Sequence, residues 1–222
     1  MQEIKEFPKM REIYGSLVFD PKAMKQRLPR DVYENLVGAI EGRQKMDSGI
    51  ADTVALAMKD WAVSKGASHW AHWFHPLTEL TAEKHTAFVT ADDNGFPLES
   101  FRGEDLMQSE PDASSFPSGG TRSTFEARGY SAWDPTSPAF IIKSPKGGTL
   151  CIPSVFLAYD GSPLDLKTYL LRSMEAVESR ALKMLKLFGN RGVRYVRATV
   201  GGEQEFFLLD RPRAQKRTDI RF

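Results

Sequence analysis

The sequence predicts an α+β protein with a helical N-terminal segment, a β-rich middle that carries a long inserted loop, and a later helix followed by strands. Apolar residues recur at helical spacing up to about residue 64, alternate as in strands from residue 67, and return to helical spacing near residue 168. The 222 residues are 41% hydrophobic and 27% charged. This composition is that of a globular chain able to bury a core.

The charge balance and the single cysteine restrict the partners and the compartment. A formal net charge of +1 gives no electrostatic reason to expect nucleic acid or an acidic membrane as the main partner. Cys151 cannot form a disulfide within the chain, and its apolar neighbours favour a buried thiol in a reducing compartment. Residues 1–12 lack a signal-peptide core, and no run reaches the ~18 apolar residues of a membrane span. We therefore expect a cytoplasmic protein.

Helices are predicted in the first 68 residues. Asp20 is expected to cap a helix that has Pro21 at its first position, and a second helix should cover about residues 31–40. The clearest early helix runs from residue 48 or 49 to about residue 64, with Gly66 as its stop. Its apolar stripe is expected to lie in the core and consists of Ile50, Val54, Met58 and Trp61.

The middle of the chain predicts strands and hairpins. From Ala67 the aromatic residues alternate in a way that suits an extended strand. Residues 87–89 and 96–101 flank an Asp-Asp-Asn-Gly turn, and residues 140–142 and 149–158 flank a second glycine-containing turn. Each pair is expected to form a hairpin.

The last part predicts one long helix and two strands. The helix should cover about residues 168–188 and end at Gly189-Asn190. Residues 194–200 and 203–210 are then expected to be strands joined by Gly201-Gly202.

The stretch from residue 110 to residue 140 is too long for a turn and has no regular pattern. Prolines stand in and beside it at Pro111, Pro117, Pro135, Pro138 and Pro145. Composition leaves two interpretations open: a stiffened surface crossover, or a functional segment, which loops of this length in compact domains usually are.

Two carboxylates in the last predicted strand could bind metal. Because strand side chains alternate, Glu203 and Glu205 would share one face with their Cα atoms ~7 Å apart. Paired carboxylates suit hard cations such as Mg²⁺ or Mn²⁺. The alternative is the solvated face of a strand.

Other catalytic patterns are weaker. His69, His72 and His75, with His85 further on, could suggest zinc, but in a strand His72 faces away from the other two. Packing or hydrogen bonding is the favoured role for these side chains. Neither Cys151 nor the loop serines have an evident base, and no glycine-rich loop has the setting of a nucleotide-binding motif.

Five long blocks of the chain are informative together: MKDWAVSKGASHWAHWFHPLTELTAEKH, EPDASSFPSGGTRSTFEARGYSAWDPTSPAF, LCIPSVFLAYDG, LDLKTYLLRS and VGGEQEFFLLD. With these blocks the chain, from about Arg11 to Phe222, resembles glutamine synthetase of the type III class. The resemblance implies a helical region at 1–68, a β-grasp-like domain with the long inserted loop at 69–163, and a helix and the first strands of a glutamine synthetase catalytic domain at 164–222.

The resemblance also implies an activity, a glutamate–ammonia ligase. ATP would phosphorylate the glutamate side chain, and ammonia would displace phosphate from the γ-glutamyl phosphate. By resemblance Glu203 and Glu205 are ligands of the catalytic Mg²⁺ or Mn²⁺. The family's active sites form between subunits of a ring-shaped homo-oligomer, so the long loop is expected to reach a neighbouring subunit.

Two departures from the family pattern qualify this expectation. The Asp-Gly-Ser-Ser loop with which other classes handle ammonium is absent, and Asp134 and then Glu126 are the acidic substitutes we name as catalytic. The chain also lacks the further metal-binding carboxylates, arginines and nucleotide pocket of the family. We therefore expect an inactive fragment of a longer product or, alternatively, a truncated non-catalytic subunit that assembles with and regulates an intact synthetase.

Overall fold

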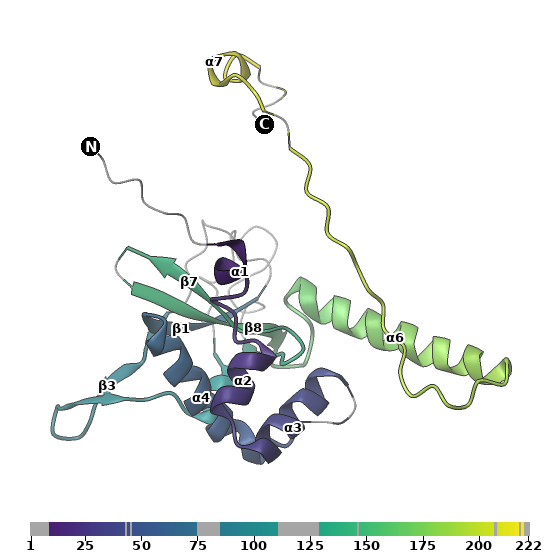
Figure 1. The fold of residues 1–222 in the computed structure, drawn as a ribbon, viewed down its shortest axis with the longest axis horizontal. Coiled ribbons are helices and arrows are strands. Elements are labelled where there is room, and N and C mark those ends of the chain that lie inside the picture. Colours follow the sequence, from purple (N-terminus) through teal and green to yellow (C-terminus); the bar gives the residue numbers. More distant parts are fainter. Residues whose placement is uncertain are drawn as a thin grey trace. The chain divides into compact units, whose positions relative to one another are not determined.

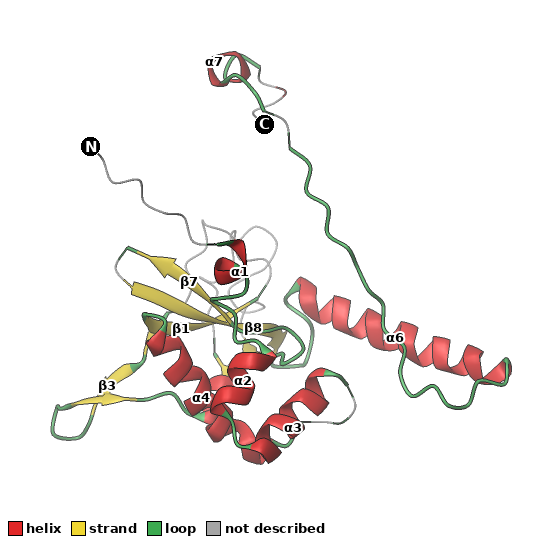
Figure 2. Cartoon of the chain, in the orientation of Figure 1, coloured by secondary structure: helices red, strands yellow, loops and turns green. Residues whose placement is uncertain are grey.

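The computed structural model describes residues 9–42, 44, 46–74, 85–110, 129–145, 147–206, 208–217 and 219. The chain divides into two compact units, Met1–Glu175 and Ala176–Phe222. Helices and a sheet together build the first unit, which confirms the predicted α+β class (Figures 1 and 2). The predicted domain boundaries at residues 68 and 163 stay predictions.

The N-terminal helices begin where the sequence predicts. After the short α1 (Met10–Ile13), α2 (Pro21–Arg27) has Pro21 at its first position, and the Asp20 carboxylate accepts a hydrogen bond of 2.7 Å from the Ala23 backbone N–H. This side chain satisfies one of the donors that a helix start leaves free. α3 (Arg30–Ile40) follows directly after Pro29.

α4 (Ala51–Ser64) is the central helix of this unit, and the 3₁₀ turn η1 (Ser48–Ile50) precedes it. Three residues of the predicted apolar stripe, Val54, Met58 and Trp61, are at most 2% exposed, and Ile50, in η1, is partly buried against the same core. Gly66 ends the helix at a φ of +88°, a conformation that a side chain would disfavour. The prediction for this helix is confirmed.

The sheet is built around its longest strand, β8. The order of strands is β2-β1-β8-β6-β5, and β7 also pairs with β8. The strands are β1 (Ala67–Trp73), β2 (Thr86–Ala87), β5 (Gln108–Ser109), β6 (Gly129–Trp133), β7 (Phe140–Ser144) and β8 (Gly147–Ala158). β1 runs parallel to β8, whereas β6 and β7 run antiparallel to it. The predicted β7–β8 hairpin is therefore confirmed.

The position of β8 follows from its sequence. Residues 150–154 are all buried, as in a strand that is covered on both faces. Gly129 of β6 lies so close to β8 that a Cβ atom there would collide with the carbonyl group of Leu157. Only glycine permits this approach of two backbones.

A second, two-stranded sheet is formed by β3 (Val89–Ala91) and β4 (Pro97–Glu99), and it extends away from the main sheet (Figure 1). The Asp92 carboxylate accepts hydrogen bonds from the backbone N–H groups of Asn94 and Phe96, and Gly95 has a φ of +82°. At its base, Lys59 of α4 donates a hydrogen bond of 2.9 Å to the Glu99 carboxylate, which raises the pKa of the lysine. The predicted hairpin is confirmed.

Helices α2, α3 and α4 lie on one side of the main sheet, and the core lies between the two layers (Figure 2). Aromatic pairs lie within this core: the rings of Phe19 and Trp61 are 5.2 Å apart, as are those of Trp70 and Phe101. Edge or tilted ring pairs at such distances add to the stability that burial provides.

The sequence did not predict the short helix α5 (Gly103–Met107) or the strand β5 that follows it, and the expectation of no regular structure at residues 110–140 is wrong where β6 forms by pairing with β8. Five residues are too few to show helical periodicity. α5 begins against the start of α4, where the Gly103 N–H donates a 2.7 Å hydrogen bond to the Asp52 carboxylate. A Cβ atom on Gly103 would lie 2.7 Å from the Asp52 backbone nitrogen, so this contact requires glycine.

The helix α6 (Leu166–Leu187) confirms the predicted long helix, and Gly189 follows it with a φ of +83°. The two strands predicted after it are wrong: residues 190–206 and 208–210 have no strand among the described residues. A strand needs a hydrogen-bonded neighbour and a surface against which to bury its apolar face. Here Val200 is 96% exposed and Leu208 100% exposed. The short helix α7 (Arg211–Ala214) follows.

In the part of the chain that the structure describes, none of the helices is long and apolar enough to cross a lipid bilayer.

Candidate functional site

The predicted metal ligands lie in the second unit. Glu203 and Glu205 are exposed and belong to a stretch without regular structure, so no strand aligns their carboxylates. Across the described residues there is no group of three or more His, Cys, Asp or Glu side chains that could hold a metal ion. Magnesium is commonly bound by one or two protein carboxylates together with substrate phosphates and water. The role of Glu203 and Glu205 as metal ligands stays a prediction.

Asp134 lies in the first unit, directly after β6, and is 6% exposed. Its Oδ1 accepts hydrogen bonds from the backbone N–H of Thr136 at 2.9 Å and from the Thr136 hydroxyl at 2.6 Å. The Asp134 N–H donates to the carbonyl oxygen of Pro153 on β8. Both the carboxylate and the backbone are thereby fixed.

The second oxygen of Asp134 forms an ion pair with Lys167 of α6. The Nζ–Oδ2 distance is 2.6 Å, and both side chains are largely buried. Among the described residues, Oδ2 accepts no hydrogen bond of regular geometry. The attraction between the two charges, and not a well-aligned hydrogen bond, therefore links Asp134 to Lys167. Lys167 Nζ also donates to the Ser137 hydroxyl at 2.8 Å. The pair connects the end of β6 to the start of α6, and removing one partner would leave a buried charge uncompensated.

Glu126, the other predicted catalytic carboxylate, lies outside the described residues, as does most of the long loop, at 111–128.

The histidines do not converge on a metal. On β1, His69 contacts the Ser68 hydroxyl and His72 points into the core, while His75 lies outside the described residues. His85 Nδ1 lies 3.1 Å from the Thr149 hydroxyl. The favoured role in packing and hydrogen bonding is confirmed for His72. Cys151 is fully buried, which confirms that prediction too.

His72 joins three elements in the interior. Its Nε2 lies 2.9 Å from the Asp105 carbonyl oxygen of α5, and its Nδ1 lies 2.8 Å from the Ser131 hydroxyl of β6. A carbonyl oxygen can only accept, so Nε2 carries the proton and Nδ1 accepts from Ser131. Ser131 is fully buried, so this serine–histidine pair is a structural link and is closed to substrate.

Burial lowers the pKa of His72 to about 4. The surrounding core disfavours the imidazolium, because a charge there loses its hydration. His72 is therefore neutral at physiological pH.

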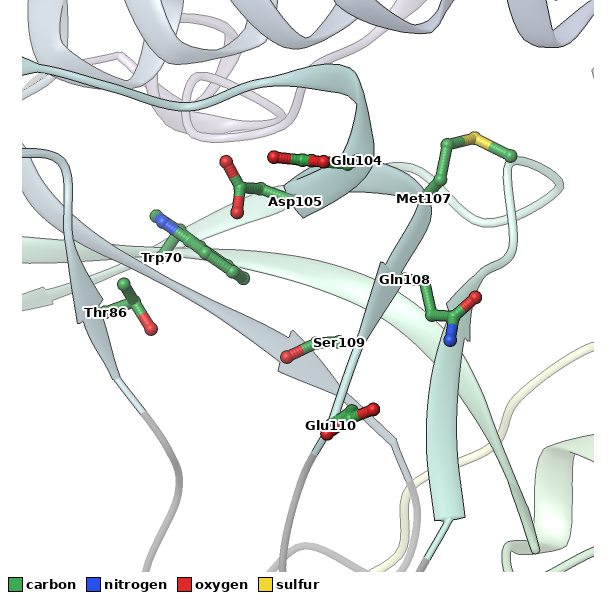
Figure 3. Close-up of a pocket in the computed structure, with 8 residues that line it drawn as sticks. All are labelled: Trp70, Thr86, Glu104, Asp105, Met107, Gln108, Ser109 and Glu110. Carbon is green, nitrogen blue, oxygen red and sulfur yellow. The ribbon is translucent and has the colours of Figure 1, made fainter. Parts of the chain in front are cut away.

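An open pocket of about 660 Å³ lies beside this link, and the two edges of the sheet border it (Figure 3). Thr86 comes from the edge strand β2, and Gln108 and Ser109 come from the opposite edge strand β5. The sheet must therefore curl, because both of its edges line one pocket. Trp70 and residues of α5 complete the lining.

The pocket is acidic. Glu104, Asp105 and Glu110 line it, and no lysine or arginine among the described residues does so. Arg102 nearby pairs with Glu104 at 2.5 Å and donates its backbone N–H to Asp105, whereas the Glu110 carboxylate has no partner among the described residues. Such a lining favours cationic groups and hydrogen-bond donors. The sequence did not reveal this pocket, because it depends on α5 and β5 and on the curl of the sheet.

Comparisons with known proteins show that this chain is similar in sequence to part of several much longer proteins. A family model described as glutamine synthetase type III N terminal matches residues 10–173. A glutamine synthetase of Bacteroides fragilis is 45% identical over 213 residues, which are 96% of this chain and 28% of that protein. A type-3 glutamine synthetase of Dictyostelium discoideum is 45% identical over 96% of this chain and 29% of its own length. A glutamine synthetase of Butyrivibrio fibrisolvens is 34% identical over 97% of this chain and 30% of its own length. The chain thus spans less than a third of these relatives.

Proposed function

The chain belongs to the glutamine synthetase type III N-terminal family, and from this membership we propose that it forms the N-terminal part of an ATP-dependent glutamate–ammonia ligase. The observation that carries the proposal is the 45% identity to two glutamine synthetases over 96% of the chain. In the proposed reaction, the glutamate side-chain carboxylate takes the terminal phosphoryl group of ATP. Ammonia then attacks the acyl phosphate, glutamine forms, and inorganic phosphate leaves.

In this proposal, the first unit supplies the platform and the rest of the enzyme supplies most of the site. The curled sheet is the β-grasp-like domain. Residues 129–133 of the predicted loop form β6 in this sheet, so it is the part of the loop before Gly129 that we propose reaches the active site of a neighbouring subunit in a ring-shaped homo-oligomer. The relatives extend well beyond the region matched here, since that region is 28–30% of their length. We assign the nucleotide pocket and the remaining metal ligands to that additional length, and the assembled enzyme to the cytoplasm.

We propose Glu203 and Glu205 as two of the ligands of the catalytic Mg²⁺ or Mn²⁺ in the complete enzyme. Neighbouring strands would convert residues 203–210 to a strand and bring both carboxylates to one face. A bound divalent cation would neutralise phosphate charge during transfer. Asp134 and Glu126 stay our candidates for handling ammonia, and Asp134 could act only where its ion pair with Lys167 opens.

The test uses the protein in which this chain continues to the length of its relatives. We expect Glu205→Ala to lower glutamine formation on the order of 10²-fold or more at limiting Mg²⁺, because one ligand of a phosphoryl-stabilising cation is lost. Gln204→Ala is the matched control, since its side chain points to the other face of the same proposed strand. Glutamine and released phosphate are measured together. Unchanged turnover of Glu205→Ala would contradict the metal assignment.

The alternative, a non-catalytic subunit that assembles with an intact synthetase, has its own measurement. Native mass spectrometry of this chain mixed with a complete type III enzyme would show mixed rings if the alternative holds. A reading frame that continues through the catalytic blocks, with no mixed assembly, would reject it.

A further inference from the structure

A hollow of about 450 Å³ lies among the N-terminal helices. The turn after α1 forms one wall, α2 forms a second, and the end of α4 forms the third. Lys22, Gln26 and Arg27 reach it from α2, and Lys65 reaches it from the residue that ends α4. Glu203, Glu205 and Asp134, the described residues that are predicted to take part in the proposed reaction, do not line this hollow.

The cations of this hollow have no charge partner among the described residues. The side chains of Lys22, Arg27 and Lys65 form no hydrogen bond or ion pair with any residue in the described ranges. This contrasts with Arg30 and Lys59 in the same helical layer, which pair with Glu34 and Glu99. Three like charges around a concave surface raise the local positive potential and repel one another.

Two carboxylates also line the hollow, and each accepts a hydrogen bond from a backbone N–H group. Glu12 accepts from the Lys9 N–H at 3.3 Å, and Asp20 accepts from the Ala23 N–H at 2.7 Å as the cap of α2. The helix starts thereby offset part of their negative charge. Among the described residues of the hollow, the charges that remain free to meet a ligand are positive.

We propose that this hollow binds a small polyanion carrying phosphate groups, with Lys22, Arg27 and Lys65 as its charge partners. The planar guanidinium of Arg27 can donate two parallel hydrogen bonds to phosphate oxygens, while the lysines act as point charges. The Ser16 hydroxyl and the Gln26 amide, which also line the hollow, offer neutral donors for the remaining oxygens. A multivalent anion satisfies all three cations at once, which a chloride ion or a single carboxylate does not.

Pyrophosphate is the probe, and isothermal titration calorimetry on the 222-residue chain is the measurement. At about 20 mM ionic strength we expect saturable one-to-one binding with a Kd below ~1 mM, weakening several-fold at about 200 mM because salt screens the charges. The double variant Lys22→Ala with Arg27→Ala should bind at least about tenfold more weakly, since it loses two charge-assisted contacts. Lys25→Ala is the matched control on α2, because Lys25 is exposed and does not line the hollow.

Circular dichroism of each variant is the folding control: an unchanged helical signal shows that a loss of binding is not a loss of folding. The proposal is overturned if pyrophosphate gives no saturable heat at low ionic strength. It is equally overturned if Lys25→Ala weakens binding as much as the double variant, because the binding would then follow net charge alone. Neither result bears on the ligase assignment, which rests on other residues.

Discussion

The two units of the chain turn similar sequence patterns into different structures. Leu150 and Leu208 both belong to apolar, strand-like stretches, but Leu150 is fully buried in β8 and Leu208 is fully exposed in an irregular segment. β8 pairs with β1, β6 and β7, whereas residues 203–206 and 208–210 pair with no strand of the described chain. An alternating pattern therefore specifies a strand only where a neighbouring strand and a covering layer exist.

The largest expected difference in stability between the two units comes from replacing a glycine in each, Gly129 and Gly202. We expect Gly129→Ala to destabilise the first unit by more than about 4 kcal/mol, because the new Cβ would overlap the Leu157 carbonyl group and the paired backbones cannot separate. Gly202→Ala should change stability by less than about 0.5 kcal/mol, since nothing lies within 4 Å of its added Cβ. Urea denaturation followed by circular dichroism measures both. A Gly129→Ala variant of unchanged midpoint would contradict the β6–β8 packing.

The next largest difference in unfolding free energy is expected between alanine variants of Leu150 and Leu208. Leu150→Ala should lower the unfolding free energy by about 3 kcal/mol, because it removes buried methyl groups and leaves a cavity beside the core. Leu208→Ala removes the same atoms from solvent and should have no measurable effect. Equal losses from the two variants would show that residue 208 is also packed.

His72 predicts a pH dependence that belongs to the first unit. Its pKa is about 4 when folded and 6.5 when unfolded, so the unfolded chain binds more protons between these values. Stability is therefore full above pH 6.5 and decreases as the pH falls toward 4, by about 2 kcal/mol between pH 7 and pH 5. His72→Gln should remove this component, while His69→Gln, whose imidazole is not in the core, should keep it. Parallel pH profiles of His72→Gln and the wild type would reject the assignment.

The smallest expected difference in stability is between two aspartates that each cap the start of a helix. Asp20 caps α2, and Asp210 caps α7 through the Arg213 N–H at 3.1 Å. Asp20→Ala should cost about 1 kcal/mol of unfolding free energy, because α2 packs on the core. Asp210→Ala should leave the unfolding midpoint unchanged, since no side chain of α7 is buried. A shift caused by Asp210→Ala would show that α7 unfolds together with the first unit.

Much of the first unit could be predicted from sequence, for local reasons. Asp20 with Pro21 marks a helix start, the Asp-Asp-Asn-Gly turn marks the β3–β4 hairpin, and the stripe of α4 marks a buried face. These signals act over a few residues and do not depend on distant partners. The strands predicted at 194–200 and 203–210 failed because strand formation depends on non-local pairing, which no local pattern guarantees.

The candidate site was harder to predict than the fold. The sequence around Glu203 and Glu205 predicts which carboxylates could bind metal, but it does not show which strands would pair with this segment and align them. The Asp134–Lys167 pair joins positions far apart in sequence, and the His72–Ser131 link crosses from β1 to β6. Neither has a spacing that marks it. The acidic pocket depends on the curl of the sheet, which brings two edge strands together and which follows from packing rather than from any motif.

Hydrogen exchange detected by mass spectrometry tests the contrast between the two units most directly. Backbone amides of β8, residues 147–158, should be protected to near the global stability of the first unit, because they lie between paired strands in the core. Amides of residues 196–206, which carry Glu203 and Glu205, should exchange at close to the rate of an unstructured peptide in the isolated chain. Protection of residues 196–206 equal to that of β8 would contradict the account, because it would show that this chain alone builds the strand that aligns the two carboxylates.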